Sequence, residues 1–397
     1  MNLSEVAANC MLKGLDVEAA TCLKLFLKDN PRDGQALLNF ATLCRRSNRL
    51  EEALEMVYRH MDTSGVAALP EAWLIFGLLC EDFGRFQEAA QAFERYQRIK
   101  LHDQNAAIAR GSSLMRLQRF DEGFPEWDFG RFLQAWRPIE NVPIWQGENL
   151  KGKRLLIIKE GGYGDAFMFS RWIPQLVAAG AVVSFDVWKS LHPLLQNLGC
   201  WLGDEPLDSG PSTFDFCCSL LGLPMLCGMR SIKNIPPPTR IQYPPYRIEN
   251  VFRRSIGLCW EAEENGETRR HRSIPPEALA PILEIDADFY SLCPETEAPA
   301  GVRSYDFGKK TWDKTAGLIS TLDLIITVDT AVAHLAGSMG WPTWLLLPMY
   351  SSWQWFTPEA FPGTTPWYPS VRVFRQKDPL SWSGVIEEVA EALKCAK

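Results

Sequence analysis

The stretch LDLIITVDTAVAHLAGSMGWPTWLLLP, residues 322–348, decides the fold of the C-terminal part of the chain. It begins with an apolar run at 322–328, continues with a helical pattern at 331–338 and ends with a second apolar run at 343–347. Short, continuous apolar runs are typical of strands buried in a parallel sheet. The stretch therefore predicts a strand, a helix and a strand, which form one βαβ unit.

The same alternation of strands and helices extends outward from this stretch in two sets. The first set has predicted strands at 155–158 and 181–187, with a glycine-rich turn and a helix at 166–179 between them. The second set adds strands at 256–260 and 289–292, helices at 275–283 and 314–321, and a last amphipathic helix at 381–396. A proline-rich stretch at 235–245 lies between the sets and reads as a linker. We predict two Rossmann-like α/β domains at 137–245 and 246–380, followed by a C-terminal helix at 381–397.

The first third of the chain repeats itself with a period of about 34 residues, which is the tetratricopeptide period. With that shift Gly77 falls on Gly111, Phe86 on Phe120 and Phe93 on Trp127. We predict a tetratricopeptide-like α-solenoid of four helical hairpins over residues 1–136, because one hairpin cannot bury its apolar face alone. An unrelated helical bundle is the alternative, and it does not explain the matched glycines and aromatics. A stacked array offers a binding face for a peptide, a partner protein or the chain's own catalytic half.

Composition limits the classes of function. A length of 397 residues favours two or three domains, and 46% hydrophobic residues favour an ordered protein. The net charge of −7 argues against non-specific binding of nucleic acid. The apolar runs are too short to span a bilayer, and no basic, apolar leader is visible at the start. The 11 cysteines are scattered without a C-x-x-C pair, which favours reduced thiols in a cytoplasmic protein over a zinc site.

Two segments resemble glycosyltransferase family 9, which includes ADP-heptose:LPS heptosyltransferases, and its bacterial relatives fused to tetratricopeptide repeats. They are LLIIKEGGYGDAFMFSRWIPQL at 155–176 and the stretch at 322–348 quoted above. The pieces IGLCW…RRHRSIPPEALAPIL and WYPSVRVFRQ…WSGVIEEVAEAL agree with the same family in the same order. The resemblance implies a GT-B fold in which the second domain binds a nucleotide-diphosphate sugar and the first faces the acceptor. It also implies inverting transfer without a metal or a separate cofactor.

The first glycine-rich turn contains the candidate catalytic residue. Asp165 matches the family's candidate general base, which takes the proton of the acceptor hydroxyl. The alternative is that Asp165 only caps the following helix. Gly162 and Gly164 allow the backbone to approach a substrate closely, and Glu160 is a second carboxylate at the turn. Arg171, on the following helix, faces either the cleft or solvent.

The second turn, after the strand at 322–328, contains the candidate diphosphate site. The helix that follows offers free N–H groups and a positive dipole end to an anion. Thr330 and Ala331 would supply hydroxyl and backbone donors, and His334 a further donor to the leaving phosphate. A structural histidine is the alternative for His334. Asp329 would orient the loop or accept hydrogen bonds from the donor sugar.

The loop after the strand at 256–260 adds positive charge. Arg272 belongs to a basic run at 269–272 beside Trp260, and this run would neutralise the departing diphosphate. A solvated charged loop is the alternative. The chain departs from the family at Glu261-Ala262-Glu263-Glu264, where relatives have a Gly-Asn-Pro type of turn. This departure places acidic residues near the proposed phosphate site.

Four further residues match family positions around the nucleoside. Ser291 and Leu292 would line the base through backbone groups, while Asp313 and Thr315 would lie near the ribose. The D-x-D string at 286–288 is interpreted as a plain connection and not as a metal site.

Two functions of different classes remain open. One is glycosyl transfer from a nucleotide sugar to an unknown acceptor: a protein, a saccharide or a nucleobase. The other is a non-catalytic scaffold in which the repeats bind partners and the transferase half has decayed. A Rossmann dehydrogenase is disfavoured because the turn reads G-G-x-G-D and not G-x-G-x-x-G.

Overall fold

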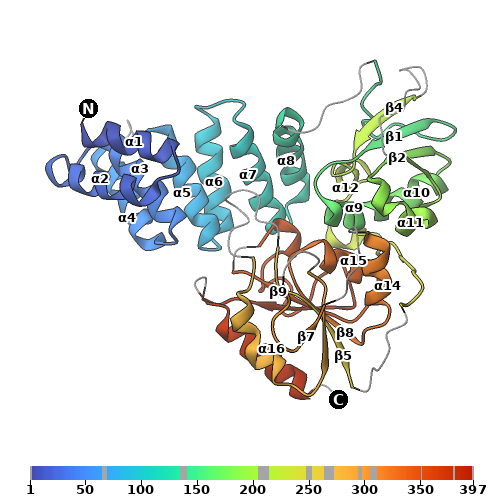
Figure 1. The fold of residues 1–397 in the computed structure, drawn as a ribbon. Coiled ribbons are helices and arrows are strands. Elements are labelled where there is room, and N and C mark those ends of the chain that lie inside the picture. The colour runs from blue at the N-terminus through green and yellow to red at the C-terminus, as the bar shows by residue number, and fades with distance from the viewer. Residues whose placement is uncertain are drawn as a thin grey trace. The chain divides into compact units, whose positions relative to one another are not determined.

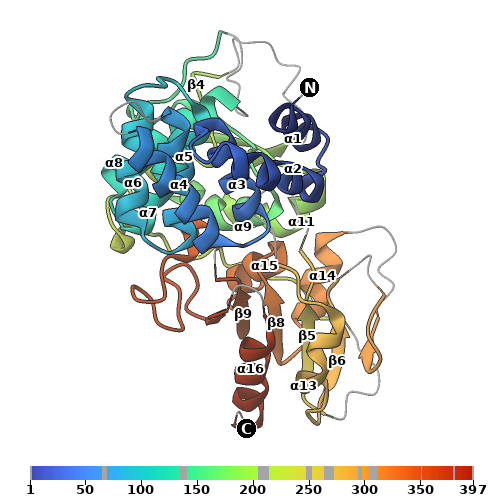
Figure 2. The same ribbon diagram turned by 90° about the vertical axis from the view of Figure 1, so that its left-hand side faces the viewer.

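The computed structural model describes residues 2–64, 69–134, 141–203, 214–246, 253–262, 272–293, 297–304, 311–349, 351–378 and 381–395. The chain divides into two compact units, Met1–Gln134 and Ala135–Lys397, and each is described by itself. Their elements are labelled in Figure 1, and Figure 2 shows them turned by 90°. Among the described residues, no helix is both long and apolar enough to cross a bilayer.

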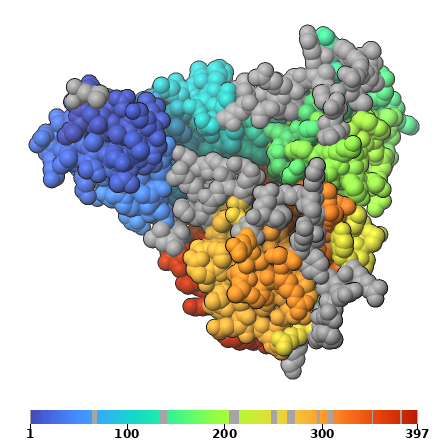
Figure 3. Space-filling model, viewed as in Figure 1, coloured from blue at the N-terminus to red at the C-terminus, as the bar shows by residue number. Residues whose placement is uncertain are grey.

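The first unit is a series of helical hairpins, as the repeat predicts. Its described helices are α1 (Leu3–Leu12), α2 (Asp16–Asp29), α3 (Gly34–Arg46), α4 (Leu50–Ser64), α5 (Pro70–Asp82), α6 (Phe86–Gln97), α7 (Gln104–Arg116) and α8 (Phe120–Gln134). Within each hairpin, an odd-numbered helix packs on the helix that follows it. Neighbouring hairpins are joined by the contacts of α2 with α3, α4 with α5 and α6 with α7. In the space-filling view of Figure 3, this unit accordingly forms one continuous surface from its first helices, in blue, to its later ones, in cyan.

A glycine faces an aromatic residue at the same place in the last two hairpins. A Cβ on Gly77 would lie 2.6 Å from the ring of Phe93. A Cβ on Gly111 would lie 2.6 Å from the backbone nitrogen of Trp127 and 2.7 Å from the carbonyl oxygen of Gly123. The backbones of α7 and α8 therefore cross closely, and only glycine fits at residue 111.

Gly111→Ala is expected to destabilise the protein, because the added methyl group overlaps backbone atoms that cannot rotate away. Overpacking of this kind costs about 1–3 kcal/mol of the free energy of unfolding. Urea denaturation followed by circular dichroism measures the change. Gly384→Ala is the control, since nothing lies within 4 Å of a Cβ at that position. Equal urea concentrations at the midpoint of unfolding for the two variants would contradict the close crossing of α7 and α8.

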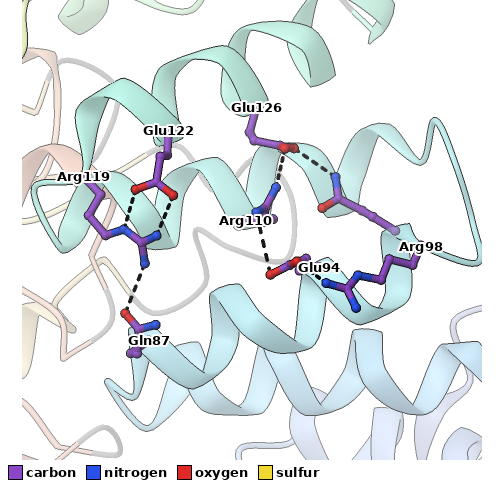
Figure 4. Close-up of polar contacts among 8 residues, drawn as sticks. Gln87, Glu94, Arg98, Arg110, Arg119, Glu122 and Glu126 are labelled. Atoms are coloured by element: carbon purple, nitrogen blue, oxygen red, sulfur yellow. Dashed lines mark hydrogen bonds and ion pairs between the residues drawn. The ribbon is translucent and has the colours of Figure 1, made fainter.

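Charged side chains link the last two hairpins (Figure 4). Arg110 on α7 forms ion pairs with Glu126 on α8 and, at 4.0 Å, with Glu94 on α6. Arg119 donates a hydrogen bond of 3.3 Å to the side-chain oxygen of Gln87 on α6. The contacts with Glu94 and Gln87 run across the hairpin boundary, whereas the pair with Glu126 lies within the last hairpin.

The second unit contains two parallel sheets. The four-stranded sheet has the order β3-β2-β1-β4, with β1 (Arg154–Ile158), β2 (Val182–Asp186), β3 (Trp201–Gly203) and β4 (Phe216–Ser219). Its helices are α9 (Tyr163–Phe169), α10 (Ile173–Ala178), α11 (His192–Leu195) and α12 (Leu223–Leu226). Along β1, Leu155 pairs with Val183 on one side and with Phe216 on the other.

The six-stranded sheet has the order β10-β9-β8-β5-β6-β7. Its strands are β5 (Ser255–Cys259), β6 (Asp288–Ser291), β7 (Val302–Arg303), β8 (Leu324–Val328), β9 (Thr343–Leu347) and β10 (Val371–Arg375). Its helices are α13 (Ala280–Leu283), α14 (Trp312–Ile319), α15 (Ala331–Met339) and α16 (Ser383–Cys395). The strand order reverses between β5 and β8, and ligands of such sheets bind outside the carboxyl ends at that point. The fold class is confirmed: an α-solenoid followed by two Rossmann-like parallel sheets with helices.

The helical stretch predicted at 166–179 is present, but it is not one uniform helix. The single helix expected at 166–179 is divided into α9, a 3-10 turn at Ser170–Trp172 and α10. Pro174 explains the break, because it has no N–H to donate to the carbonyl of Ser170. The proline-rich stretch predicted as a linker is hydrogen-bonded to α14 and α15, the helices of the second sheet. Tyr246 donates from its N–H to the carbonyl of Gly317 at 3.0 Å.

Candidate functional site

The start of α9, after β1, lies against the start of α15, after β8 (Figure 1). A Cβ on Gly164 would lie 2.7 Å from Cδ2 of His334 and 3.4 Å from Cα of Ala331. Further along both helices, the hydroxyl of Ser338 donates to the carbonyl of Phe167 at 3.3 Å. The two helices therefore run in the same direction, and their positive ends lie together where the carboxyl edges of the two sheets meet.

Asp165 lies in the first turn of α9 and its side chain is half-buried. Its Oδ2 accepts a hydrogen bond of 2.7 Å from the N–H of Gly162. Gly161 precedes this turn with φ of +79°, and a Cβ at Gly161 would collide with the carboxylate. Asp165 therefore does cap its helix, and the turn fixes the carboxylate at Gly161 and Gly162, while the preceding residue, Gly164, touches α15.

Glu160 lies on the other side of the same turn. Its carboxylate accepts a hydrogen bond from the hydroxyl of Ser219, which ends β4. The hydroxyl of Ser219 itself accepts from the N–H of Gly222 at 3.2 Å. Glu160 is therefore at the point where the first sheet reverses its strand order, next to β4, whereas Asp165 lies next to α15.

The start of α15 has the features of an anion site. Thr330 occupies the N-cap position, but its hydroxyl does not cap the helix and lies 3.3 Å from Oγ1 of Thr327 instead. Arg272 donates to the carbonyl of Asp329 at 2.7 Å and also approaches its carboxylate at 3.9 Å. Among the described residues, a helix end without a side-chain cap thus lies beside a guanidinium group.

His334 is held in a fixed orientation one turn into α15. It is 8% exposed, and its ring stacks on Trp355 with centroids 5.0 Å apart. Nδ1 lies 3.0 Å from the hydroxyl of Tyr368. Burial lowers the pKa of His334 to about 4, and the charges of Arg171 and Arg272 act in the same direction, against Asp329. The imidazole is therefore neutral near pH 7.

Arg171 faces neither the cleft nor solvent, contrary to both alternatives from the sequence. It is 3% exposed, and its guanidinium lies 4.9 Å from the ring centroid of Tyr368. Nε donates to the carbonyl of Met168 at 2.7 Å, and Nη1 donates to that of Trp367 at 2.9 Å. Arg171 thus joins the two α/β halves directly behind His334. Sequence reasoning did not identify Tyr368, because no spacing links residues so far apart in the chain.

The predicted nucleoside residues lie at the carboxyl ends of β5 and β6, next to β8. Trp260, Ser291 and Leu292 are buried. The hydroxyl of Ser291 accepts a hydrogen bond from the N–H of Cys293 at 3.2 Å. The N–H of Leu292 donates to the carbonyl of Leu258 at 2.8 Å. With these side chains buried, a ligand at this edge would meet mainly the backbone.

The remaining predicted residues are divided between α14 and the loop before Arg272. Asp313 and Thr315 lie in the first turns of α14, and Asp313 accepts a hydrogen bond of 3.1 Å from the hydroxyl of Tyr243. In the acidic segment 261–264, where the chain departs from the family, Glu261 is exposed. Glu263 and Glu264, like the basic residues 269–271, fall outside the described residues. The D-x-D carboxylates form ion pairs, Asp286 with Arg253 at 2.6 Å and Asp288 with Arg303 at 3.0 Å.

Comparison with known proteins gives partial similarities. No family model matches the chain. Protein FlbA of Caulobacter vibrioides is 25% identical over 453 residues, which cover 92% of this chain and 73% of FlbA. A tetratricopeptide repeat protein from Parabacteroides merdae has 22% identity and a TM-score of 0.30 over 34% of this chain and 53% of its own. The dodecameric, iron-containing heptosyltransferase TibC, in complex with ADP-D-β-D-heptose, has 11% identity and a TM-score of 0.47 over 63% of this chain and 78% of its own.

Proposed function

We propose that this protein is an inverting glycosyltransferase that moves a sugar from a nucleotide-diphosphate sugar to an acceptor hydroxyl. The observation that carries the proposal is the contact of Gly164, next to Asp165, with the first turn of α15. This contact supports the proposal because Asp165, as the general base, and the start of α15, as the anion site, would then adjoin at the carboxyl edges of the two sheets, where α/β proteins bind ligands. The resemblance of both turns to glycosyltransferase family 9 supports the same assignment.

In the proposed reaction, Asp165 takes the proton of the acceptor hydroxyl. The acceptor oxygen forms a bond to the anomeric carbon on one face, while the bond from that carbon to the diphosphate oxygen breaks on the opposite face. The electron pair of the broken bond leaves with the nucleoside diphosphate. This in-line displacement inverts the anomeric centre and requires a base on the acceptor side only.

The negative charge on the leaving diphosphate would be stabilised at the start of α15. The N–H groups at Thr330 and Ala331, the helix dipole and the guanidinium of Arg272 supply positive potential there without a divalent cation. Asp329 would bind the donor sugar's hydroxyls. The remaining donor contacts would come from backbone groups at Gly162 and Gly164 and from residues around the nucleoside: Trp260, Ser291, Leu292, Asp313 and Thr315.

His334 would donate a hydrogen bond to the leaving phosphate as a neutral imidazole. The guanidinium of Arg171 donates a hydrogen bond to the hydroxyl oxygen of Tyr368, so that the hydroxyl's own proton would point to Nδ1 of His334. Nε2 then carries the ring's own hydrogen, which is the hydrogen that a phosphate oxygen accepts. Arg171 and Tyr368 are positioning residues in this scheme, since they act through His334.

Binding of nucleoside diphosphate is the first test. We expect ADP, GDP or UDP to raise the melting temperature of the full chain, with EDTA making no difference. Ligand at a hundred times its Kd adds about 2.7 kcal/mol to the free energy of unfolding. The scaffold alternative predicts no shift with any of the three. A shift that disappears in EDTA would refute metal-independent binding.

The second test is a hydrolysis screen of nucleotide sugars with the same full chain. The nucleotide that stabilises the protein selects the donors, and release of nucleoside diphosphate is measured. Stabilisation without turnover, with or without acceptors, would favour a decayed transferase.

A further inference from the structure

Three aromatic side chains form a partly exposed cluster beside Asp165. Tyr163 is 38% exposed, and its ring centroid lies 5.0 Å from that of Trp188 and 5.2 Å from that of Trp312. Phe167 supports Trp312 from behind with an edge-to-face contact at 5.6 Å. We call Tyr163, Trp188 and Trp312 the aromatic wall.

The wall lies at the carboxyl edges of the sheets. Tyr163 begins α9 two residues before Asp165, Trp188 follows β2, and Trp312 begins α14 in the other half of the unit. Residues from both α/β halves therefore build the wall. Large aromatic side chains that are left partly in water at such an edge mark a ligand site rather than core packing.

The charges around the wall limit which ligand it takes. Glu160, Asp165 and Asp186 lie at the ends of β1 and β2, together with Lys159 and Lys189, and the first turn of α14 adds one charge of each sign, Asp313 and Lys314. Lys159 is already paired with Asp186 at 3.3 Å, and its ammonium lies 5.9 Å from the ring of Trp188. Apart from the pair of Asp186 and Lys159, two carboxylates, Glu160 and Asp165, lie at these strand ends against the ammonium of Lys189. This small excess of negative charge disfavours an anionic acceptor, and the carboxylates can accept hydrogen bonds from hydroxyl groups.

We infer that the aromatic wall binds the acceptor and that the acceptor is an uncharged sugar ring. One face of a pyranose carries C–H groups and matches the apolar faces of Tyr163 and Trp188. Its edge carries hydroxyls, one of which lies at Asp165 for deprotonation. This inference rests on the proposed function, because it assigns the wall to the acceptor side of the proposed site.

Saturation-transfer NMR on the full chain tests the inference with simple probes. These are the methyl glycosides of glucose, galactose and mannose, and the methyl glycoside of glucuronic acid as an anionic counterpart. We expect saturation transfer to the ring C–H protons of at least one neutral glycoside, and weaker transfer to the glucuronide. Trp188→Ala should weaken binding about tenfold, as the loss of one aromatic stacking partner predicts, and Trp188→Phe should retain most of it.

Two further variants keep the test decisive. Tyr163→Leu replaces Trp188→Ala if the latter does not fold, because Tyr163 lies at an exposed helix start. Trp201→Ala is the matched control, since Trp201 is 50% exposed on β3 and outside the wall. It should leave glycoside binding unchanged.

Four results would overturn the inference. They are no transfer to any neutral glycoside, equal transfer to the glucuronide, a wall variant that binds like the wild type, and loss of nucleoside-diphosphate stabilisation in Trp188→Ala. The last would assign the wall to the donor. Failure of the proposed function looks different, because the wild type itself would then show no nucleoside-diphosphate stabilisation.

Discussion

Asp165→Asn is expected to abolish most of the transfer activity while leaving nucleoside-diphosphate binding intact. General-base catalysis contributes about 10²–10⁴-fold to a rate, and an amide cannot take the proton. The amide oxygen of asparagine still accepts the hydrogen bond from Gly162, so the cap of α9 survives. The variant therefore separates the two interpretations of Asp165 that the sequence leaves open.

The measurement is the turnover of a nucleotide sugar, together with a titration by the corresponding nucleoside diphosphate. Asp103→Asn is a matched control, because Asp103 caps α7 through the N–H of Ala106 at 3.0 Å and lies in the first unit. It should turn over donor at the wild-type rate. Wild-type turnover by the Asp165→Asn protein would reduce Asp165 to a capping residue.

His334 is expected to make the protein less stable as the pH falls from about 6.5 to about 4. Burial and two neighbouring arginines lower the pKa of His334 to about 4 in the folded state, against 6.5 for an ordinary histidine. Between these values the unfolded chain binds the proton and the folded chain does not, so acid favours unfolding. The full effect corresponds to about 3 kcal/mol, of which about 2 kcal/mol are lost by pH 5.

The comparison that isolates this effect is wild type against His334→Gln, each unfolded in urea at about pH 7 and pH 5. The wild type should lose about 2 kcal/mol more than the variant between the two conditions. His60, whose pKa burial also lowers, is common to both proteins and so cancels. Equal losses would mean that the buried imidazole is solvated or paired with an acid.

The strands and the repeats were predictable because they depend on local patterns. The runs at 155–158 and 343–347 contain only residues that suit a strand buried on both faces, and they begin and end within a residue of β1 and β9. Gly77 and Gly111 repeat because each hairpin needs room for its own aromatic residue. The closeness of the two turns follows from the same patterns, since ligands of such sheets bind at the carboxyl ends of the strands, and Gly164 does lie against Ala331 and His334.

The surroundings of His334 were not predictable. Its partners, Trp355 and Tyr368, come from the segment between β9 and β10, which has no repeating pattern. The burial of Arg171 depends on carbonyl groups of residues far apart in the chain, and an arginine on a short helix gives no sign of such burial. The aromatic wall likewise gathers residues from three elements that no spacing connects.

The buried guanidinium of Arg171 also bears on how substrates would enter and leave. It is bonded to Met168 in one half, Trp367 in the other and Pro236 in the connecting segment at 3.3 Å. Swinging the halves apart at this seam would break the bond to Trp367 and expose the apolar rings of Phe169 and Trp172 that pack on Trp367, which is costly. Substrate exchange would therefore proceed by small displacements of side chains and loops at the mouth, with α9 and α15 clamped together throughout the catalytic cycle.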